Sequence, residues 1–103
     1  MDINEIRKLC NDKNIEVTSH FLTRCYQRNI AYSDVKYAIT NGEIIEQYEN
    51  DYPYPSCLIF GVTKAQRVLH VVVGIGDNKL WLITAYEPAS DKWNIDMKTR
   101  KGE

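Results

Sequence analysis

Apolar residues recur at helical spacing in the first part of the chain and at strand spacing after it. Helices are predicted over residues 1–10, 19–29 and 33–41. Ser19 and Ser33 are suitable N-caps, because their hydroxyl groups can accept hydrogen bonds from the first backbone N–H groups of a helix. Gly42 is a typical stop signal, because glycine adopts the backbone conformation that ends many helices without steric cost.

After Gly42 the apolar positions follow the alternating pattern of β-strands. The segment EIIEQYEN predicts a short strand, and the runs SCLIFGVT, RVLHVVVGIG and KLWLITAYE predict three longer ones. The last three are joined by KAQ and GDN, which are short enough for hairpins. The sequence therefore predicts one α+β domain over residues 1–103, with N-terminal helices packed on one face of a four-stranded antiparallel sheet.

The composition favours a globular protein and gives no strong indication of a partner. Of the 103 residues, 44% are hydrophobic and 26% are charged, with a formal net charge of −1. These are ordinary globular values, and the small charge gives no overall attraction to nucleic acid. The acidic N-terminus does not resemble a signal peptide, and the apolar runs are too short to cross a bilayer. We therefore expect a cytoplasmic chain without membrane contact.

The cysteines and histidines do not have the spacing of a metal site. Cys10, Cys25 and Cys57 are an odd number without a CxxC motif, which predicts thiols rather than disulfides. Structural zinc sites need four nitrogen or sulfur ligands in local pairs, so no metal is expected. No glycine-rich phosphate loop is found, because GIGDN leads from one strand directly into another. We therefore expect no cofactor.

The segment SHFLTRCYQRNI places three cationic or imidazole side chains four residues apart on the second predicted helix: His20, Arg24 and Arg28. At helical spacing these side chains lie at the border of the apolar face that contains Phe21 and Cys25. Two interpretations remain open. The arginine stems can cover the rim of the core with their charges in solvent, or the three groups can bind phosphate.

The predicted strands contribute a second set of candidate groups. Alternation places His70 on the strand face opposite Val71, which is expected to be core. In the next strand, alternation places Thr84 and Tyr86 on one face together with Leu82. A single histidine in a strand is commonly a structural residue with its hydrogen bonds satisfied, and Tyr86 also fits an aromatic position at the core edge.

Together these side chains suit metal-free cleavage of RNA. In this reaction the ribose 2′-hydroxyl attacks the adjacent phosphate, which requires a base, a proton donor and fixed positive charge. Histidine can serve as the base and as the donor near neutral pH, and arginine can bind the charged phosphate. DNA lacks the 2′-hydroxyl, so the reaction would select RNA. Arg100 and Lys101 can contribute further charge, while Tyr48 and the aromatic DYPYP segment can stack on bases or on a protein partner.

Six motifs in order resemble the bacterial domain-of-unknown-function 4258 family: SHFLTRCYQRNI, SDVKYAITNGEIIEQY, DYPYPSCLIFG, LHVVVG, ITAYEP and KWNIDMKTRK. The resemblance covers residues from about 12 to 101. That family is similar to RelE-like and MqsR-like toxins, which are small metal-independent ribonucleases. The resemblance implies a RelE/barnase-like α+β fold with helices before a curved antiparallel sheet. It also implies a toxin role, with a zinc-finger antitoxin as partner.

The resemblance also suggests individual roles. The positions that match its motifs are His20, Arg24, Arg28, Tyr48, His70, Thr84, Tyr86, Trp93 and Arg100. His20 and His70 are the expected acid–base pair. Arg24 is expected to bind phosphate. Thr84 and Tyr86 are expected to position the scissile group, with Arg28, Arg100, Lys101 and Tyr48 as further RNA contacts.

A second hypothesis is a non-catalytic module of the same fold that binds a protein through the DYPYP aromatics and the sheet edge. The near-zero net charge favours this hypothesis, because RelE-like toxins are typically strongly basic, whereas the series of His20, Arg24 and Arg28 favours the nuclease. A homo-oligomer is compatible with the module. The two hypotheses differ in whether His20, Arg24, His70 and Tyr86 line one concave surface.

Overall fold

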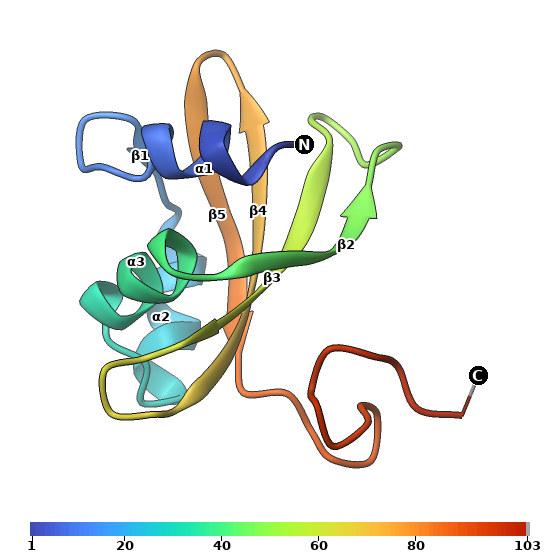
Figure 1. Ribbon diagram of the computed structural model, residues 1–103. Helices are drawn as coiled ribbons and strands as arrows, with labels where there is room; N and C mark the ends of the chain where they lie inside the picture. The colour runs from blue at the N-terminus through green and yellow to red at the C-terminus, as the bar shows by residue number, and fades with distance from the viewer. Residues whose placement is uncertain (103) are drawn as a thin grey trace.

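A computed structural model describes residues 1–102 of the chain. The helices are α1 (Ile3–Leu9), α2 (Ser19–Gln27) and α3 (Tyr32–Thr40), and the strands are β1 (Ile15–Glu16), β2 (Glu43–Tyr48), β3 (Ser56–Val62), β4 (Val68–Gly76) and β5 (Lys79–Tyr86). The strands form one sheet in the order β1-β5-β4-β3-β2, with all three helices on one side of it (Figure 1). The predicted α+β class is confirmed.

The predicted sheet of four antiparallel strands is wrong in one respect, because a fifth strand makes the sheet mixed. Ile15 and Glu16 of β1 pair in parallel with Leu80 and Trp81 of β5. The carbonyl group of Asn14 also accepts a hydrogen bond of 2.9 Å from the backbone of Leu80. A strand of two residues is too short to produce an alternating pattern, so no pattern in the sequence indicates it.

The helices occur where they were expected, but two of the predicted caps are wrong. Thr18 caps α2, because its hydroxyl oxygen accepts a hydrogen bond of 3.1 Å from the backbone N–H of Phe21. The cap of α3 is Ala31, which offers no side-chain acceptor, so Ser33 lies inside the helix. None of the helices formed by residues 1–102 is long and apolar enough to cross a membrane.

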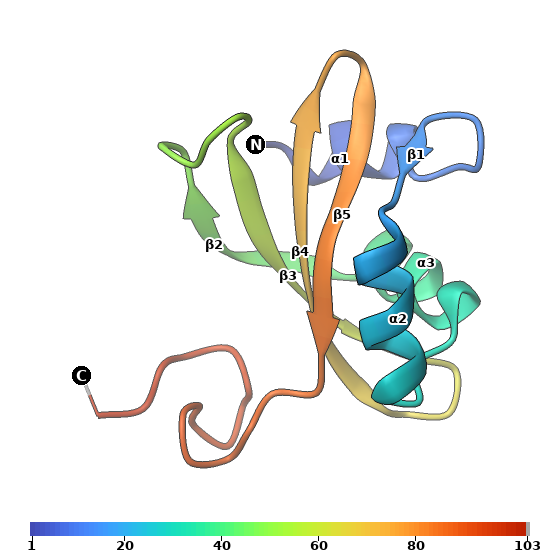
Figure 2. The ribbon, with the colours of Figure 1, turned by 180° about the vertical axis from the view of Figure 1, so that it is seen from behind.

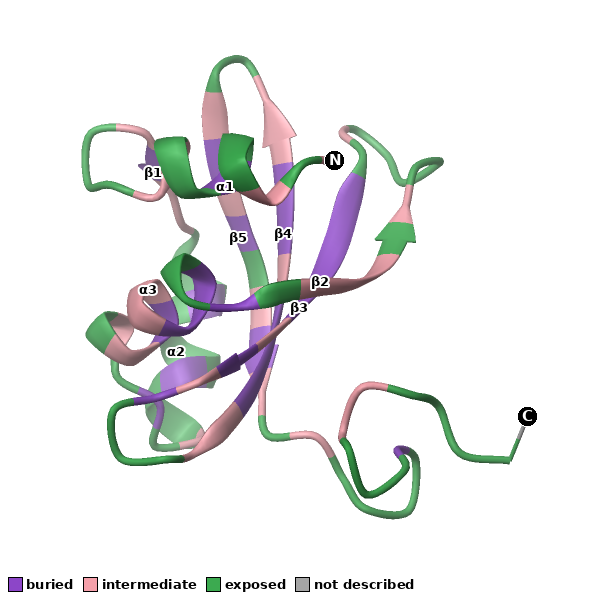
Figure 3. Ribbon diagram, in the orientation of Figure 1, coloured by how far each residue is buried: buried purple, intermediate pink, exposed green. Residues whose placement is uncertain are grey.

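The core lies between the three helices and one face of the sheet (Figure 3). Phe21 of α2 packs there with alternate strand residues such as Ile59 and Val71, all of which are fully or almost fully buried. Gly61 of β3 allows α3 to approach the sheet closely. A Cβ atom at Gly61 would lie only 2.4 Å from the carbonyl oxygen of Ala38.

An irregularity in β5 changes which of its side chains share a face. Ile83 has no partner in the pairing with β4 and is an extra residue in the strand. Leu82 and Ala85 therefore both belong to the core, although they are three residues apart. Thr84 and Tyr86 share the opposite face, as predicted. The prediction that they share this face with Leu82 is wrong.

Residues 88–102, here called the strap, lie on the side of the sheet away from the helices (Figure 2). The strap contains no helix or long strand, but Trp93 and Arg100 form an antiparallel bridge that closes it into a loop. Trp93 anchors the strap on the sheet and is 3% exposed, whereas Ile95 of the same segment is 99% exposed. The strap therefore covers part of the sheet face that carries His70.

Candidate functional site

His70 lies on the middle strand β4, on the sheet face opposite the helices, and is fully buried under the strap. Its ring makes edge contacts with Trp93 of the strap and Tyr86 of β5, at centroid distances of 4.5 Å and 5.5 Å. The Nε2 atom lies 2.6 Å from the carbonyl oxygen of Met97. The residue is thus fixed by aromatic neighbours and by the strap backbone.

This environment favours the neutral form of His70. Burial lowers the pKa of the imidazole, and the Met97 carbonyl only partly opposes this effect. Because a carbonyl oxygen can only accept, Nε2 carries the proton and Nδ1 carries the lone pair. Nδ1 is buried and has no hydrogen-bond partner among residues 1–102. The site therefore contains a buried, unpartnered basic nitrogen.

A bidentate ion pair connects β2 to the strap next to His70. The Nε and Nη2 atoms of Arg100 donate to the two carboxylate oxygens of Glu46 at 2.8 Å and 3.0 Å. The hydroxyl of Tyr48 donates to the same carboxylate. Hydrogen bonding from Arg100 lowers the pKa of Glu46, and burial together with Glu46 raises the pKa of Tyr48 to about 12. Glu46 is therefore ionised and Tyr48 protonated near neutral pH.

Arg28 reaches β5 from the end of α2. Its Nη1 atom donates to the carbonyl oxygen of Ala85 at 2.7 Å and lies 3.4 Å from the hydroxyl oxygen of Thr84. Arg67 holds this end of the helix, because its Nη2 atom donates to the carbonyl of Arg28 at 2.9 Å and to Glu87 at 2.9 Å. The two predicted residues Arg28 and Thr84 are thus brought together.

The phenol of Tyr86 lies within the electrostatic influence of the Arg28 and Arg100 guanidinium groups. Burial raises the pKa of its hydroxyl, while the positive charges of Arg100 and Arg28 oppose the rise. Tyr86 also lines a hollow of about 380 Å³ at the end of β5 together with Arg100, Trp93 and Lys92. We use the name Tyr86 cluster for Tyr86 together with Arg28, His70 and Arg100. The cluster combines a phenol, an imidazole and two positive charges.

The expected pairing of His20 with His70 is wrong. His20 and Arg24 are exposed on α2, whose buried residues pack on the helix-covered face of the sheet, whereas His70 points to the other face. Neither side chain forms a hydrogen bond with another residue in the described part of the chain. His20 and Arg24 thus cannot share a concave site with His70 and Tyr86. Lys101 is in the strap and donates to the carbonyl of Ser90 at 3.3 Å.

Several residues of the site were not predicted from the sequence. Glu46 and Met97 contact Arg100 and His70 directly, and Lys92 lines the hollow. Glu46 could have been found, because it alternates with the predicted residue Tyr48 in a short strand. Met97 acts through its backbone, with a positive φ of 58°, and no side-chain pattern indicates such a contact.

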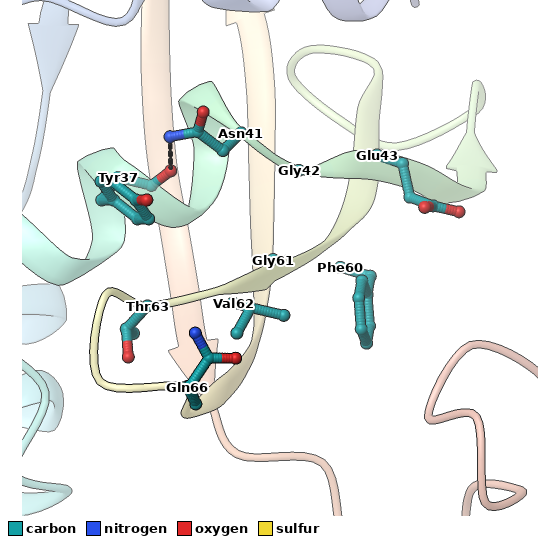
Figure 4. A pocket seen from close by; sticks show the side chains of 9 residues that line it. All are labelled: Tyr37, Asn41, Gly42, Glu43, Phe60, Gly61, Val62, Thr63 and Gln66. Carbon is teal, nitrogen blue, oxygen red and sulfur yellow. Dashed lines mark hydrogen bonds between the residues drawn. The ribbon is translucent and has the colours of Figure 1, made fainter.

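A second hollow, of about 300 Å³, lies between the end of α3 and β3 (Figure 4). It is lined by Tyr37, Asn41, Gly42, Glu43, Phe60, Gly61, Val62, Thr63 and Gln66. The only charged residue in this lining is Glu43, so the hollow is poorly suited to an anionic ligand. In residues 1–102 no group of three or more histidine, cysteine or acidic side chains is placed to bind a metal ion.

Comparison with known proteins gives one match. The model of the family described as "Domain of unknown function (DUF4258)" matches residues 17–87, which include α2 and all strands from β2 to β5. No curated protein and no solved structure matches the chain. The matched region contains His70, Tyr86 and Arg28 but ends before the strap.

Proposed function

The chain belongs to the DUF4258 family, and we propose that it is a toxin-type endoribonuclease that cleaves RNA without a metal ion. The observation that carries this proposal is the Tyr86 cluster at the end of β5, where Tyr86 contacts the imidazole of His70, lines a hollow with Arg100, and follows Ala85, whose carbonyl binds Arg28. A RelE/barnase-like fold is part of the proposal. It is supported by the order of the elements, in which the helices precede an antiparallel meander of four strands.

In the proposed reaction His70 is the base. The neutral ring offers the lone pair of Nδ1, while the Nε2 proton is held by the Met97 carbonyl, which fixes the orientation of the ring. Nδ1 takes the proton of the ribose 2′-hydroxyl as the 2′-oxygen attacks the phosphorus. A lowered pKa keeps the imidazole unprotonated and ready to accept this proton at neutral pH.

Tyr86 and the two arginines act on the other side of the phosphorus. The raised pKa of Tyr86 keeps its hydroxyl protonated, so it can donate a proton to the departing 5′-oxygen. Arg28 and Arg100 stabilise the extra negative charge of the pentavalent phosphorane. The products are a 2′,3′-cyclic phosphate and a free 5′-hydroxyl. A proton is then transferred from His70 to Tyr86 through water, which restores both groups for the next reaction.

Access to Nδ1 of His70 requires movement of the part of the strap around Trp93, with the Met97 carbonyl still bonded to Nε2, because the ring is fully buried. Trp93 and Met97 are the strap residues that contact the ring. Toxins of this type are controlled by a partner, and we include a zinc-finger antitoxin in the proposal. The hypothesis of a non-catalytic binding module is favoured by two observations. His20 and Arg24 do not share a concave surface with His70 and Tyr86, and Tyr52 in the DYPYP segment is 96% exposed.

The test is an RNA cleavage assay with purified protein and a single-stranded RNA in EDTA. The wild type should produce cyclic-phosphate ends. Tyr86→Phe keeps the ring but lacks the proton donor and should lower the rate by at least about a hundredfold. Tyr26→Phe is the matched control, because Tyr26 is 87% exposed on α2. Equal rates for the two variants would refute the site, and absence of cleavage by the wild type would refute the nuclease.

A further inference from the structure

The hollow at the end of β5 has the composition of an anion site. Tyr86 and Trp93 form aromatic walls, and Lys92 and Arg100 bring positive charge from opposite ends of the strap. The only acidic residue in the lining, Glu87, is neutralised by an ion pair of 2.9 Å with Arg67. Lys92 forms no salt bridge with any residue in the described chain. Because Arg100 is itself paired with Glu46, the lining carries one unpaired positive charge among the described residues, that of Lys92, once internal pairs are taken into account.

Arg100 connects this hollow to Glu46 of β2. The guanidinium lies over the ring of Trp93, 4.7 Å from the centroid, and makes the bidentate pair with Glu46. Its side chain remains 50% exposed, whereas that of Glu46 is 23% exposed. An anion in the hollow can thus reach Arg100 and compete with Glu46 for it. Arginine binds carboxylates and phosphates with the same bidentate geometry, which makes such an exchange chemically direct.

We infer that this hollow binds a backbone phosphate of a single-stranded nucleic acid, with Lys92 and Arg100 as its cations and Glu46 as an internal competitor for Arg100. The inference rests on the proposed function in taking a nucleic acid as the ligand. It adds Lys92, which was not among the predicted residues, and it assigns Glu46 the role of weakening the binding of substrate. A single strand fits better than a duplex, because the hollow is small and borders aromatic side chains.

Exchange of Arg100 between the carboxylate of Glu46 and a bound phosphate also affects the strap. Lys98 is the other strap cation held by β2, through an ion pair of 3.1 Å with Glu43. When Arg100 moves to a phosphate, the strap loses its bidentate connection to β2 beside His70. Binding in the hollow therefore loosens the segment that buries the base of the proposed reaction.

The experiment measures binding of a fluorescent thymidine tetranucleotide to the full chain by anisotropy at several salt concentrations. The probe is DNA, which lacks the 2′-hydroxyl and cannot be cleaved by this mechanism. Lys92→Ala should weaken binding and reduce the slope of log affinity against log salt by about 0.7, the value for one lost contact to a single strand. Lys92→Arg should retain binding. Lys8→Ala, on the exposed surface of α1, is the matched control.

Glu46→Gln separates competition from a structural role. Release of Arg100 should tighten binding by about 1.5- to fivefold, which is the range of ion pairs near the surface, whereas a residue that only supports the fold would weaken binding when changed. The site is refuted if Lys92→Ala binds like Lys8→Ala. The competition is refuted if folded Glu46→Gln binds no tighter than wild type. If binding depends on Lys92 but no RNA is cleaved, the phosphate site is retained and the nuclease is refuted. If RNA is cleaved but binding does not depend on Lys92, the nuclease is retained and the phosphate site is refuted.

Discussion

The Nε2 atom of His70 lies 2.6 Å from the carbonyl oxygen of Met97, a strap residue 27 positions further along the chain. This contact assigns the ring proton to Nε2 and leaves Nδ1 as a buried lone pair without a partner in residues 1–102. Asp96 supports the geometry, because its carboxylate accepts hydrogen bonds from the backbone N–H groups of Lys98 and Thr99. The strap turn thus aims one carbonyl group at one imidazole.

Acid should destabilise the fold through His70. The pKa of His70 is lowered in the folded state by burial, so the unfolded chain binds a proton at a higher pH than the folded chain does. The free energy of unfolding is therefore expected to fall as the pH decreases below about 6.5, by up to about 1.4 kcal/mol per pH unit. Urea unfolding of wild type and His70→Gln between pH 7 and 5 checks this, and a constant difference between the two proteins would contradict it.

Arg28 should contribute to stability, and Arg24 should not. Arg28→Ala removes the donor to the Ala85 carbonyl and the contact with Thr84, which is expected to cost about 1–3 kcal/mol of unfolding free energy. Arg24 is exposed, so Arg24→Ala should change the same quantity by less than about 0.5 kcal/mol. Denaturant unfolding of the two variants measures the contrast. Similar losses would mean that the reach of Arg28 to β5 does not support the fold.

Gly61 should be essential for the packing of α3 on β3. In Gly61→Ala the new Cβ atom would lie 2.4 Å from the carbonyl oxygen of Ala38 and 2.6 Å from its Cβ atom. The helix must move away, which we expect to cost about 1–3 kcal/mol or more. At Gly74 the nearest atom would be 3.3 Å away, so Gly74→Ala should cost clearly less. Thermal unfolding of both variants tests the order, and the reverse order would contradict this account of the interface.

The sequence predicted the long helices and strands of the fold better than its short strand and its strand irregularity. The helices and the strands β2 to β5 were predicted from long periodic segments. An element that buries one face repeats its apolar residues with the period of that element. The two-residue strand β1 and the extra residue Ile83 were not predictable in this way. A single inserted residue reverses the faces of the positions after it, which is why Leu82 was assigned to the wrong group.

The candidate site was predictable in part. Alternation along β5 placed Thr84 and Tyr86 on one face, and this is confirmed, whereas the register of the pairing of β4 with β5, which brings His70 onto the same face, was not predicted. Spacing on α2 identified His20 and Arg28 together, but only Arg28 reaches β5. Periodicity shows that two residues share a helix face, not which sheet edge that face borders. The strap has no apolar period, so no pattern in the sequence indicates that Met97 covers His70.

Trp93 should hold the strap closed over His70. Its side chain is 3% exposed and contacts both the imidazole and the guanidinium of Arg100. Trp93→Ala removes this anchor and should lower the free energy of unfolding by about 3–5 kcal/mol if the strap unfolds with the domain. If the strap detaches alone, the loss is smaller, and amide hydrogens that are bonded within the strap, such as that of Lys101 to the Lys92 carbonyl, exchange much faster. Ile95→Ala is the control, since Ile95 is 99% exposed and its loss should leave both measurements unchanged. Unchanged stability and unchanged exchange in Trp93→Ala would mean that the ion pairs to β2, rather than the indole, hold the strap on the sheet.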